Sequence, residues 1–384
     1  MVPRAARAAG RHRGACALSQ VNLELLLADG ARALSATWGR PVLLTDPEVL
    51  RTGPRSHVVR ARVVGGEAQS IVLKHFRDEP VCGLDDWAGT LFLSRAGVPG
   101  SPRFLAGSVE ARLFVMEDLG PGHSLESLLR GEDAHAASTG LLSIVRLTAQ
   151  LHIRTLQAQA EYDAVRQAVE PRHERVRIEN ARYLLDNAGR LQRWAEAVGA
   201  QVAPGTHEDL ERLARTLADP GPFLAFTHGD MAPSNTLFTR EGSHLVDFEY
   251  AGMRHSLYDA LMWLLIVPLP EELISRADIT YRIVLAQGCE EARVDSVYAQ
   301  ARAELAAART VNVLQWISPK ALERDRDWAP GFTERAALLR HLERCRALQD
   351  LVHPVPALSS TLESIESRLR ERWTVEPFVW PAFR

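Results

Sequence analysis

Residues 227–238 read Thr-His-Gly-Asp-Met-Ala-Pro-Ser-Asn-Thr-Leu-Phe, and residues 245–249 read Leu-Val-Asp-Phe-Glu. Asp230 and Asn235 therefore lie five residues apart on what we predict to be one short loop. Pro233 lies between them and restricts the backbone, which suits a loop that must hold two side chains in set directions. The stretch predicts a polar site built on a constrained loop.

Asp247 follows an apolar stretch, residues 243–246, that we predict to be a short strand. This strand would bring a second carboxylate to the loop that carries Asp230 and Asn235. Phosphoryl transfer needs a carboxylate near the acceptor hydroxyl and oxygen ligands that hold Mg²⁺ against the phosphates. The Asp-x4-Asn spacing is also that of the catalytic loop of protein kinases. We therefore expect Asp230 to be the catalytic base and Asn235 and Asp247 to be the metal ligands.

The full pattern, His228-Gly-Asp-x4-Asn235 followed by Asp247-Phe-Glu249, resembles the catalytic motif of the aminoglycoside phosphotransferase and choline kinase family. The fold of that family is similar to that of protein kinases. Gly229 stands where protein kinases usually carry Arg, and Glu249 where they carry Gly, so both residues resemble the small-molecule branch. The resemblance implies an α+β, protein-kinase-like fold with two lobes, a small β-rich N-lobe and a larger helical C-lobe. It also implies an ATP- and Mg²⁺-dependent phosphotransferase that phosphorylates a hydroxyl group of an aminoglycoside-, choline- or sugar-like molecule.

The pattern of the chain changes near residue 120 as such a fold requires. Before it the apolar runs are short and β-branched, and after it longer patterns with a period of 3.6 residues dominate. We expect residues 21–119 to form the nucleotide-binding N-lobe and residues 120–384 to form the helical C-lobe with the catalytic loop and the acceptor site. Residues 1–20 carry four arginines and no acidic residue. We expect a disordered basic tail there, with a targeting segment or a mis-set start as the alternatives.

Residues 70–77, Ser-Ile-Val-Leu-Lys-His-Phe-Arg, form an apolar, β-branched run that predicts a strand. Lys74 and Lys320 are the only lysines among the 45 Lys and Arg residues of the chain. A lysine kept where arginine is the norm indicates that a compact ammonium group is required there. By the resemblance, Lys74 holds the α- and β-phosphates of ATP.

The family pairs this lysine with a Glu on the following helix. Residues 85–99 resemble that helix and its Gly-Val-Pro turn, and alignment on the turn puts Asp86 in the partner position. Because Asp is one methylene shorter than Glu, Asp85 and Glu79 are alternatives for the same role.

Two further segments resemble nucleotide contacts of the family. Residues 51–64 take the place of the hairpin that covers the phosphates, and they contain a single glycine, Gly53. Residues 113–117 read as an edge strand that runs into the hinge, whose backbone would pair with the adenine edge. The nucleotide-binding residues expected from this resemblance are Lys74, Asp86, Ser56, His57, Met116, Glu117, Asp118 and Leu119.

Two residues are expected to support the catalytic loop rather than to take part in the chemistry. His228 would brace the loop through hydrogen bonds to the backbone. Asp259 follows Ser256-Leu-Tyr and resembles a family aspartate that ties the loop to the helix beneath it.

Composition narrows the set of partners. A formal net charge of −3 provides no basic field for nucleic acid. The longest apolar run, residues 261–267, is far shorter than the roughly 20 residues that a membrane span requires, and it predicts a core helix. The four cysteines lack the paired spacing of a zinc site or a disulfide scaffold. They fit a reducing compartment, so we expect a cytoplasmic enzyme without a membrane partner.

The sequence does not decide between two kinds of lining for the acceptor site. An aromatic box could bind a cationic substrate through cation–π contacts, and a carboxylate-lined cleft could attract the same substrate. Neutral acceptors such as sugars or macrolides remain open as well. Helices expected between residues 162 and 218 can help to wall the pocket. The candidates are Trp263, Trp316, Trp328, Trp373 and Trp380 for the first wall and Glu271, Glu272, Asp325 and Asp327 for the second.

Two other classes of protein fit parts of the pattern. A pseudokinase that binds nucleotide in a regulatory role would fit the short Asp86 side chain and the hairpin with one glycine. A metal-dependent hydrolase could use the same carboxylates, with His228 and His255 near the motif. The sequence has no paired His spacing for such a metal site.

Overall fold

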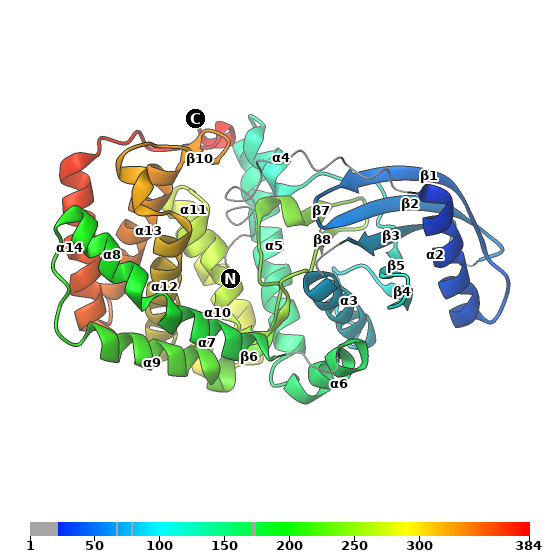
Figure 1. Cartoon of the computed structure of the whole chain (residues 1–384), viewed down its shortest axis with the longest axis horizontal. Coiled ribbons are helices and arrows are strands. Elements are labelled where there is room, and N and C mark those ends of the chain that lie inside the picture. Colours follow the sequence, from blue (N-terminus) through cyan, green and yellow to red (C-terminus); the bar gives the residue numbers. More distant parts are fainter. Residues whose placement is uncertain (1–21, 67, 78–79, 171–173) are drawn as a thin grey trace.

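The computed structural model describes residues 22–66, 68–77, 80–170 and 174–384. Their backbone forms an α+β structure of two lobes, one built on a sheet and one largely helical (Figure 1). The two-lobed, protein-kinase-like fold predicted from the sequence is therefore confirmed. The tail expected over residues 1–20 and the alternative partner Glu79 lie outside the described residues, and the boundary at residue 119 stays a prediction.

The N-lobe contains one antiparallel sheet of five strands in the order β1-β2-β3-β5-β4. Its strands are β1 (Leu43–Thr52), β2 (Ser56–Val64), β3 (Ser70–Phe76), β4 (Phe104–Ser108) and β5 (Leu113–Glu117). The prediction that residues 113–117 form an edge strand is wrong. The chain adds β4 outside β5, so that β5 pairs on both sides, with β3 and with β4.

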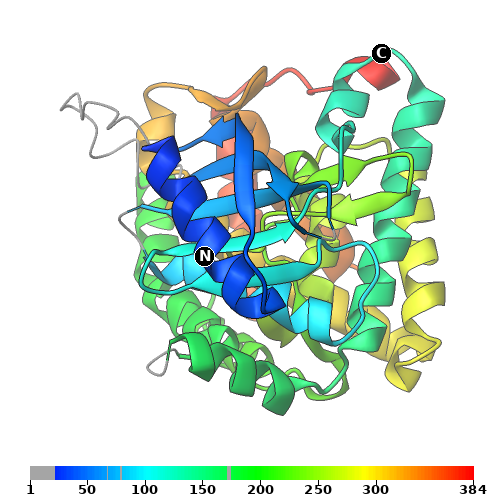
Figure 2. The ribbon, with the colours of Figure 1, turned by 90° about the vertical axis from the view of Figure 1, so that its right-hand side faces the viewer.

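Two helices cover the two faces of this sheet. Helix α2 (Leu23–Trp38) lies across the outer face (Figure 2), and α3 (Pro80–Arg95) lies on the side of the C-lobe. Successive side chains of a strand point to opposite faces. Leu73 therefore packs in the cluster under α2, whereas its neighbour Lys74 points to the other face.

Helix α2 was not predicted from the sequence. Local signals for this helix exist: the Asn22 side chain accepts a hydrogen bond from the backbone N–H of Leu25, and Gly39 ends the helix in the left-handed conformation with φ of 66°. The apolar stripe between them packs on the sheet.

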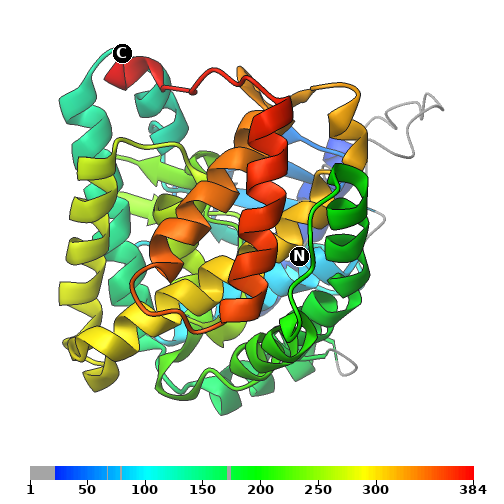
Figure 3. The ribbon, with the colours of Figure 1, turned by 90° about the vertical axis from the view of Figure 1, so that its left-hand side faces the viewer.

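The C-lobe is a group of helices with four short strands around the catalytic loop (Figures 1 and 3). Its helices are α4 (Leu125–Arg130), α5 (Ala134–Arg154), α6 (Gln159–Val169), α7 (Val176–Asp186), α8 (Ala188–Val198), α9 (Thr206–Ala218), α10 (Leu257–Leu261), α11 (Glu271–Leu285), α12 (Asp295–Trp316), α13 (Glu334–Gln349) and α14 (Pro356–Arg372). The short strands pair as β6 (Leu224–Thr227) with β9 (Gly252–His255) and β7 (Thr236–Phe238) with β8 (Ser243–Leu245). A further hairpin, β10 (Asp327–Ala329) with β11 (Phe332–Thr333), interrupts the region expected to be helical throughout.

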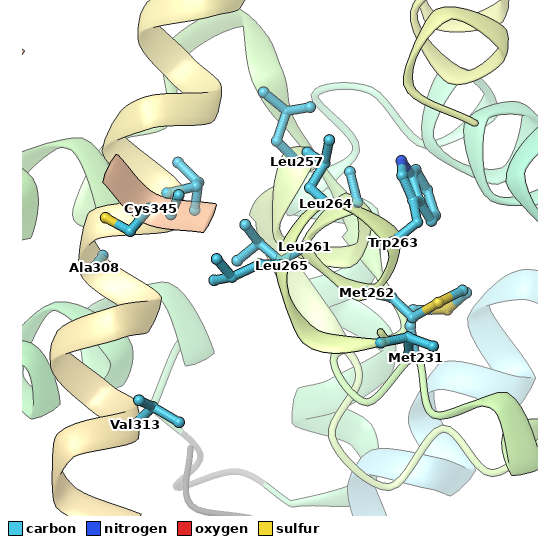
Figure 4. Close-up of a cluster of buried hydrophobic side chains, with 14 of the residues drawn as sticks. Met231, Leu257, Leu261, Met262, Trp263, Leu264, Leu265, Ala308, Val313 and Cys345 are labelled. Atoms are coloured by element: carbon cyan, nitrogen blue, oxygen red, sulfur yellow. The ribbon is translucent and has the colours of Figure 1, made fainter. Parts of the chain in front are cut away.

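The apolar run 261–267 is buried as predicted, but it continues α10 as a π-helical segment, η3 (Met262–Ile266). In Figure 4, Leu261 and Leu265 point toward the helices that carry Ala308 and Cys345, whereas Met262 points toward Met231 of the catalytic loop. π-Helical turns often occur at functional sites because the wider turn redirects side chains. Here one segment packs in the core on one side and contacts the catalytic loop on the other. Among the described helices, none has the length and apolar character needed to cross a membrane.

Gly30 of α2 allows the helix to lie close to the sheet. A Cβ atom at this position would lie 2.3 Å from Cδ2 of Leu73, which is fully buried. Replacing Gly30 by Ala improves helix propensity by up to about 1 kcal/mol, yet overpacking costs about 1–3 kcal/mol. We expect Gly30→Ala to lower the free energy of unfolding, measured by urea denaturation. Gly189 in α8 has open space around it, so Gly189→Ala is the matched control and should leave stability equal or higher.

Candidate active site

The catalytic loop follows β6, and His228 at its start is fully buried. The His228 Nε2 atom lies 2.9 Å from the carbonyl oxygen of Val246, and Nδ1 lies 3.3 Å from the backbone N–H of Asp230. A carbonyl can only accept and a backbone N–H can only donate, so Nε2 carries the proton and Nδ1 accepts. His228 is held in one neutral tautomer between the loop and the segment that leads to Asp247.

Asp259, at the start of α10, accepts three hydrogen bonds beneath the loop. They come from the backbone N–H of His228 at 2.7 Å, from that of Gly229 at 2.9 Å and from Nε2 of His152 at 3.1 Å. Burial alone would raise the pKa of Asp259, but the His152 ring and these N–H groups lower it below its ordinary value. The carboxylate therefore stays ionised and anchors the loop.

Gly229 is required by both backbone and space. Its φ is 81°, in the left-handed region, and a Cβ atom would lie 2.1 Å from the carbonyl oxygen of Tyr250. A residue with a side chain would therefore push the loop away from the segment after Asp247. This accounts for the Gly in place of the Arg of protein kinases.

Asp230 is exposed, and Asn235, at the end of the one-turn segment η2 (Pro233–Asn235), is buried. The Asn235 side-chain nitrogen donates to the backbone oxygen of Asp230 at 3.0 Å. The backbone oxygen of Asn235 accepts from the N–H of Val246 at 3.0 Å. The structure thus brings Asp230, Asn235 and the residue before Asp247 together. The amide oxygen of Asn235 accepts one long hydrogen bond, from the Ser234 hydroxyl at 3.4 Å.

Asp247 lies in a buried ion cluster with Lys74 and Asp86. The Lys74 ammonium nitrogen lies 2.5 Å from Oδ1 of Asp247 and also forms an ion pair with Oδ2 of Asp86. Burial by itself would lower the pKa of Lys74, but the two carboxylate charges outweigh it and raise that pKa. Burial likewise opposes ionisation of Asp247, yet the charge of Lys74 lowers its pKa to about 2. At Asp86, by contrast, burial and the charge of Asp247 outweigh the charge of Lys74 and raise the pKa of that carboxyl. Lys74 and Asp247 are therefore the ionised pair of the cluster at neutral pH.

The short Asp86 side chain reaches Lys74 because α3 lies unusually close to its neighbours. A Cβ atom on Gly83 would lie 2.3 Å from the ring of Phe76 in β3, and one on Gly89 would lie 3.1 Å from Phe226. Asp86 also accepts a hydrogen bond from the backbone N–H of Phe248 at 2.9 Å. The missing methylene is thus compensated by two glycines on the same helix.

The alternative partner Asp85 points elsewhere, because neighbouring residues of a helix face different directions. Its carboxylate pairs with Arg166 of α6 at 2.8 Å. Burial raises the pKa of Asp85 to about 6, partly against the charge of Arg166.

The hairpin between β1 and β2 contacts the C-lobe through two arginines that sequence analysis did not assign. Arg51 lies 3.2 Å from Oδ2 of Asp247. Arg55 pairs with Glu249 at 2.6 Å and donates to the Tyr250 hydroxyl at 2.6 Å. No local sequence signal predicts such partners, which lie almost 200 residues away.

The two residues expected to contact phosphate lie at the base of this hairpin. Ser56 is half-buried, and its backbone oxygen closes the turn by accepting from the N–H of Gly53 at 2.9 Å. His57 is buried: Nδ1 lies 3.3 Å from the Thr52 hydroxyl and the ring stacks on His75. The His57 ring therefore faces the sheet rather than the cleft.

The expected hinge, Met116 to Leu119, is half-buried and follows β5 directly. The Asp118 carboxylate is held by Arg60 at 2.8 Å, by the Ser70 hydroxyl at 2.8 Å and by the N–H of Gly120 at 3.0 Å. Glu117 pairs with Arg103 at 3.2 Å. Both acidic side chains are used within the N-lobe, so a nucleotide would meet the backbone of this segment.

A cavity of about 290 Å³ opens beside the catalytic loop, and Asp230 lines it. Of the five candidate tryptophans, Trp328 and Trp380 line this cavity, whereas Trp263, Trp316 and Trp373 are buried in the core. The carboxylates at this cavity belong to Glu126, Asp230 and Asp259, not to the four acidic residues proposed for a carboxylate-lined cleft. The four candidates that are absent from its described lining are Glu271, Glu272, Asp325 and Asp327.

Helices α6 to α9, in the region expected to help wall the acceptor pocket, are absent from the described lining of this cavity. They pack on α3, α12, α14 and β9. The hairpin 327–333 and Trp380 line the cavity as well, so part of its wall comes from segments that follow the catalytic loop by about 100 residues or more.

The sequence model of the phosphotransferase enzyme family matches residues 59–294. This match covers more than half of the chain and includes the ion cluster and the catalytic loop. The chain belongs to the phosphotransferase enzyme family. It is therefore an enzyme, and its two-lobed, kinase-like architecture is that of the family.

Several solved structures are similar to this phosphotransferase. A choline/ethanolamine kinase family protein from Mesorhizobium loti is 17% identical, over 84% of this chain and 93% of its own, with a TM-score of 0.44. Macrolide 2′-phosphotransferase from Brachybacterium faecium is 19% identical, over 78% and 93%, with a TM-score of 0.42. The ternary complex of streptomycin, ATP and APH(2″)-IIa is 12% identical, over 87% and 99%, with a TM-score of 0.45. No curated protein matches the phosphotransferase significantly, so its assignment rests on the family match.

Removing the ammonium group from the ion cluster should destabilise this phosphotransferase. Lys74→Met leaves buried Asp86 without a cation and Asp247 with only the exposed Arg51, and breaking such a buried pair costs about 3–5 kcal/mol. We expect a loss of this size in the free energy of unfolding at pH 7, measured by urea denaturation. Lys320, the other lysine, is exposed, and Lys320→Met should change stability by less than about 0.5 kcal/mol.

The same pair of variants gives a pH signature. The pKa of Asp247 is lowered to about 2 in the folded protein, from an ordinary value near 3.8. Its contribution to stability is therefore present above about pH 4 and lost as the pH falls toward 2. We expect the stability difference between wild type and Lys74→Met to shrink across this window, and a constant difference would contradict an ionised cluster.

Proposed function

We propose that this enzyme transfers the γ-phosphoryl group of ATP to a hydroxyl group of a small molecule, with Asp230 as the general base. The proposal is supported most by one observation: Asp230 lines the cavity, and the same loop holds Asn235 and, through Val246, the segment of Asp247. An acceptor in the cavity would thus lie next to the base, with the oxygen ligands on the far side of the loop.

In the proposed step Asp230 removes the proton of the acceptor hydroxyl. The acceptor oxygen forms a bond to the γ-phosphorus as the bond from that phosphorus to the β-phosphate oxygen breaks, and ADP leaves. Asp230 then carries the proton until it passes to solvent. The hydrogen bonds to Asp259 and His228 hold the loop in place, so little reorganisation is needed when the acceptor binds.

We assign the nucleotide to the cleft between the lobes. Lys74, oriented by Asp86, would hold the α- and β-phosphates. Ser56 and the backbone of its turn would cover the phosphates, with His57 packed behind them, and the backbone of residues 116–119 would meet the adenine.

Asn235 and Asp247 suit Mg²⁺, which prefers hard oxygen ligands. The Asp247 carboxylate is ionised and already faces two cations, Lys74 and Arg51. The amide oxygen of Asn235 is the acceptor end left by the bond from its nitrogen to Asp230. When bound, the metal would neutralise charge that develops on the phosphates during transfer.

We place the enzyme in the cytoplasm. Cys289 and Cys345, the cysteines whose side chains the structure describes, are free and buried, which suits a reducing compartment.

Asp230→Asn should lower kcat by about 10²- to 10⁴-fold, since it removes the general base. The measurement is ADP formation with Mg²⁺ and a panel of aminoglycosides, macrolides, choline, amino alcohols, sugars and hydroxy acids. Asp186→Asn, at an exposed site on α7, is the matched control and should keep wild-type turnover. Nucleotide affinity should stay within about threefold in both variants. Equal turnover in wild type and Asp230→Asn would exclude this base, and nucleotide binding without transfer to any acceptor would favour a pseudokinase.

Asn235→Ala should raise the Mg²⁺ concentration for half-maximal activity by about tenfold or more, because an oxygen ligand is lost. Asn235→Asp keeps an oxygen ligand and loses the nitrogen that donates to Asp230. If Asn235 binds the metal, the Asp variant should retain a Mg²⁺ requirement near that of wild type. If both variants show the same raised requirement, Asn235 acts through the loop instead.

A further inference from the structure

The cavity beside Asp230 has an apolar body. Met262 and Ile266 of the π-helical segment, Val267 and Pro268 form one side, and Phe332 of the β10–β11 hairpin forms another. Apolar walls bury the carbon skeleton of a ligand, and the few charged groups that reach the cavity determine which ligand binds.

Five charged side chains line the cavity, and three of them already have assigned partners. Glu126 pairs with Arg130 at 2.8 Å. Asp259 is held by the N–H groups of the catalytic loop. Asp230 is the proposed base, and Arg309 forms no ion pair within the described part of the chain.

Arg309 extends from α12 into the cavity. Its guanidinium group stacks 4.1 Å above the centre of the Trp316 ring and hydrogen-bonds to the Tyr258 hydroxyl. Its Nε atom is buried and has no hydrogen-bond partner. Burial lowers the pKa of Arg309, and the charge of Asp230 opposes this change only in part. Arg309 as a whole is half-buried, and a partly desolvated guanidinium group that forms no ion pair among the described residues is unfavourable unless a ligand supplies the negative charge.

The aromatic faces that could receive a cationic substrate are partly covered by the protein itself. Arg130 lies over the Trp380 ring, 5.4 Å from its centre, and Arg309 covers Trp316. Cation–π sites need an open ring face. Of the tryptophans that line the cavity, Trp380 is therefore covered by a guanidinium group, whereas Trp316 lies in the core behind Arg309 and outside the lining.

We propose that the acceptor is a hydroxyl compound that also carries a carboxylate or phosphate group, bound by Arg309 while its carbon skeleton lies against the apolar walls. This inference rests on the proposed function, because it takes the cavity beside Asp230 as the acceptor site. Arg is suited to the task since its planar fork of N–H groups matches the two oxygens of such an anion. The hydroxyl group then faces Asp230.

The test uses four probes with the same ring and differing charge: 4-(hydroxymethyl)benzoate, 4-(hydroxymethyl)benzamide, 4-(hydroxymethyl)benzylamine and 4-(hydroxymethyl)phenyl phosphate. Their dissociation constants are measured by calorimetry on the full chain with Mg²⁺ and a non-hydrolysable ATP analogue. Benzoate should bind about tenfold or more tightly than the neutral benzamide, the usual gain of a charge-assisted hydrogen bond, and the benzylamine should bind most weakly. The phosphate probe, compared with benzoate, shows which of the two anions the site prefers.

Arg309→Gln should reduce the benzoate-to-benzamide ratio to about threefold or less, and Arg309→Lys should give an intermediate ratio. Arg302 is the matched control: it is on the same helix, stacks on Tyr298 and pairs with Asp278, outside the cavity. Arg302→Gln should keep the wild-type ratio. If Arg309→Gln does not fold, the benzoate-to-benzamide ratios of the wild type and of Arg309→Lys still test the inference.

A wild-type ratio near one, tighter binding of the benzylamine, or binding of no probe would overturn the inference, and so would an unchanged ratio in Arg309→Gln. The proposed function is judged separately by turnover in Asp230→Asn. An enzyme that depends on Asp230 but prefers neutral or cationic acceptors keeps the function and loses the inference. An anion preference that depends on Arg309, together with turnover that does not depend on Asp230, does the reverse.

Discussion

The buried ion cluster of Lys74, Asp86 and Asp247 is the interaction on which the rest of the site depends. It joins β3, α3 and the segment after β8 at one point between the lobes. Away from water opposite charges attract strongly, and Lys74 is the group that keeps Asp247 ionised. Asp86 also holds the backbone of Phe248. The position of Asp247, and with it the segment bonded to Asn235, therefore follows from this cluster.

Local spacing allowed the sequence to predict the parts of the site that lie on one short segment. Asp230, Asn235 and Asp247 belong to a motif of some 20 residues, and the β-branched run around Lys74 predicts its strand. Contacts that depend on distant segments could not be predicted in the same way. Asp86 reaches Lys74 only because Gly83 and Gly89 let α3 approach, which no count of residues along the chain reveals. The same limit explains the wrong edge strand, since the outer place of β4 is a matter of sheet order.

The acceptor cavity was the hardest part of the site to predict, because it is built from many distant segments. Its charged and aromatic residues come from α4, the catalytic loop, α10, α12, the β10–β11 hairpin and the segment of Trp380. Composition suggested tryptophans and carboxylates as walls, yet three of the five tryptophans are in the core and the arginines were not considered. Arg309 has no sequence signal, because its significance depends on its place in the fold: it lines the cavity and forms no ion pair with any residue that the structure describes.

The scarcity of lysine gives the molecule a simple chemical reporter. Amines react with acylating reagents only when they are accessible and deprotonated, and Lys74 is buried, ion-paired and held protonated by its neighbours. Lys320 is exposed. Among the described residues, an acylating reagent should therefore modify only Lys320 while the ion cluster holds the lobes together. Acylation of Lys74 would then report that the cleft between the lobes has opened.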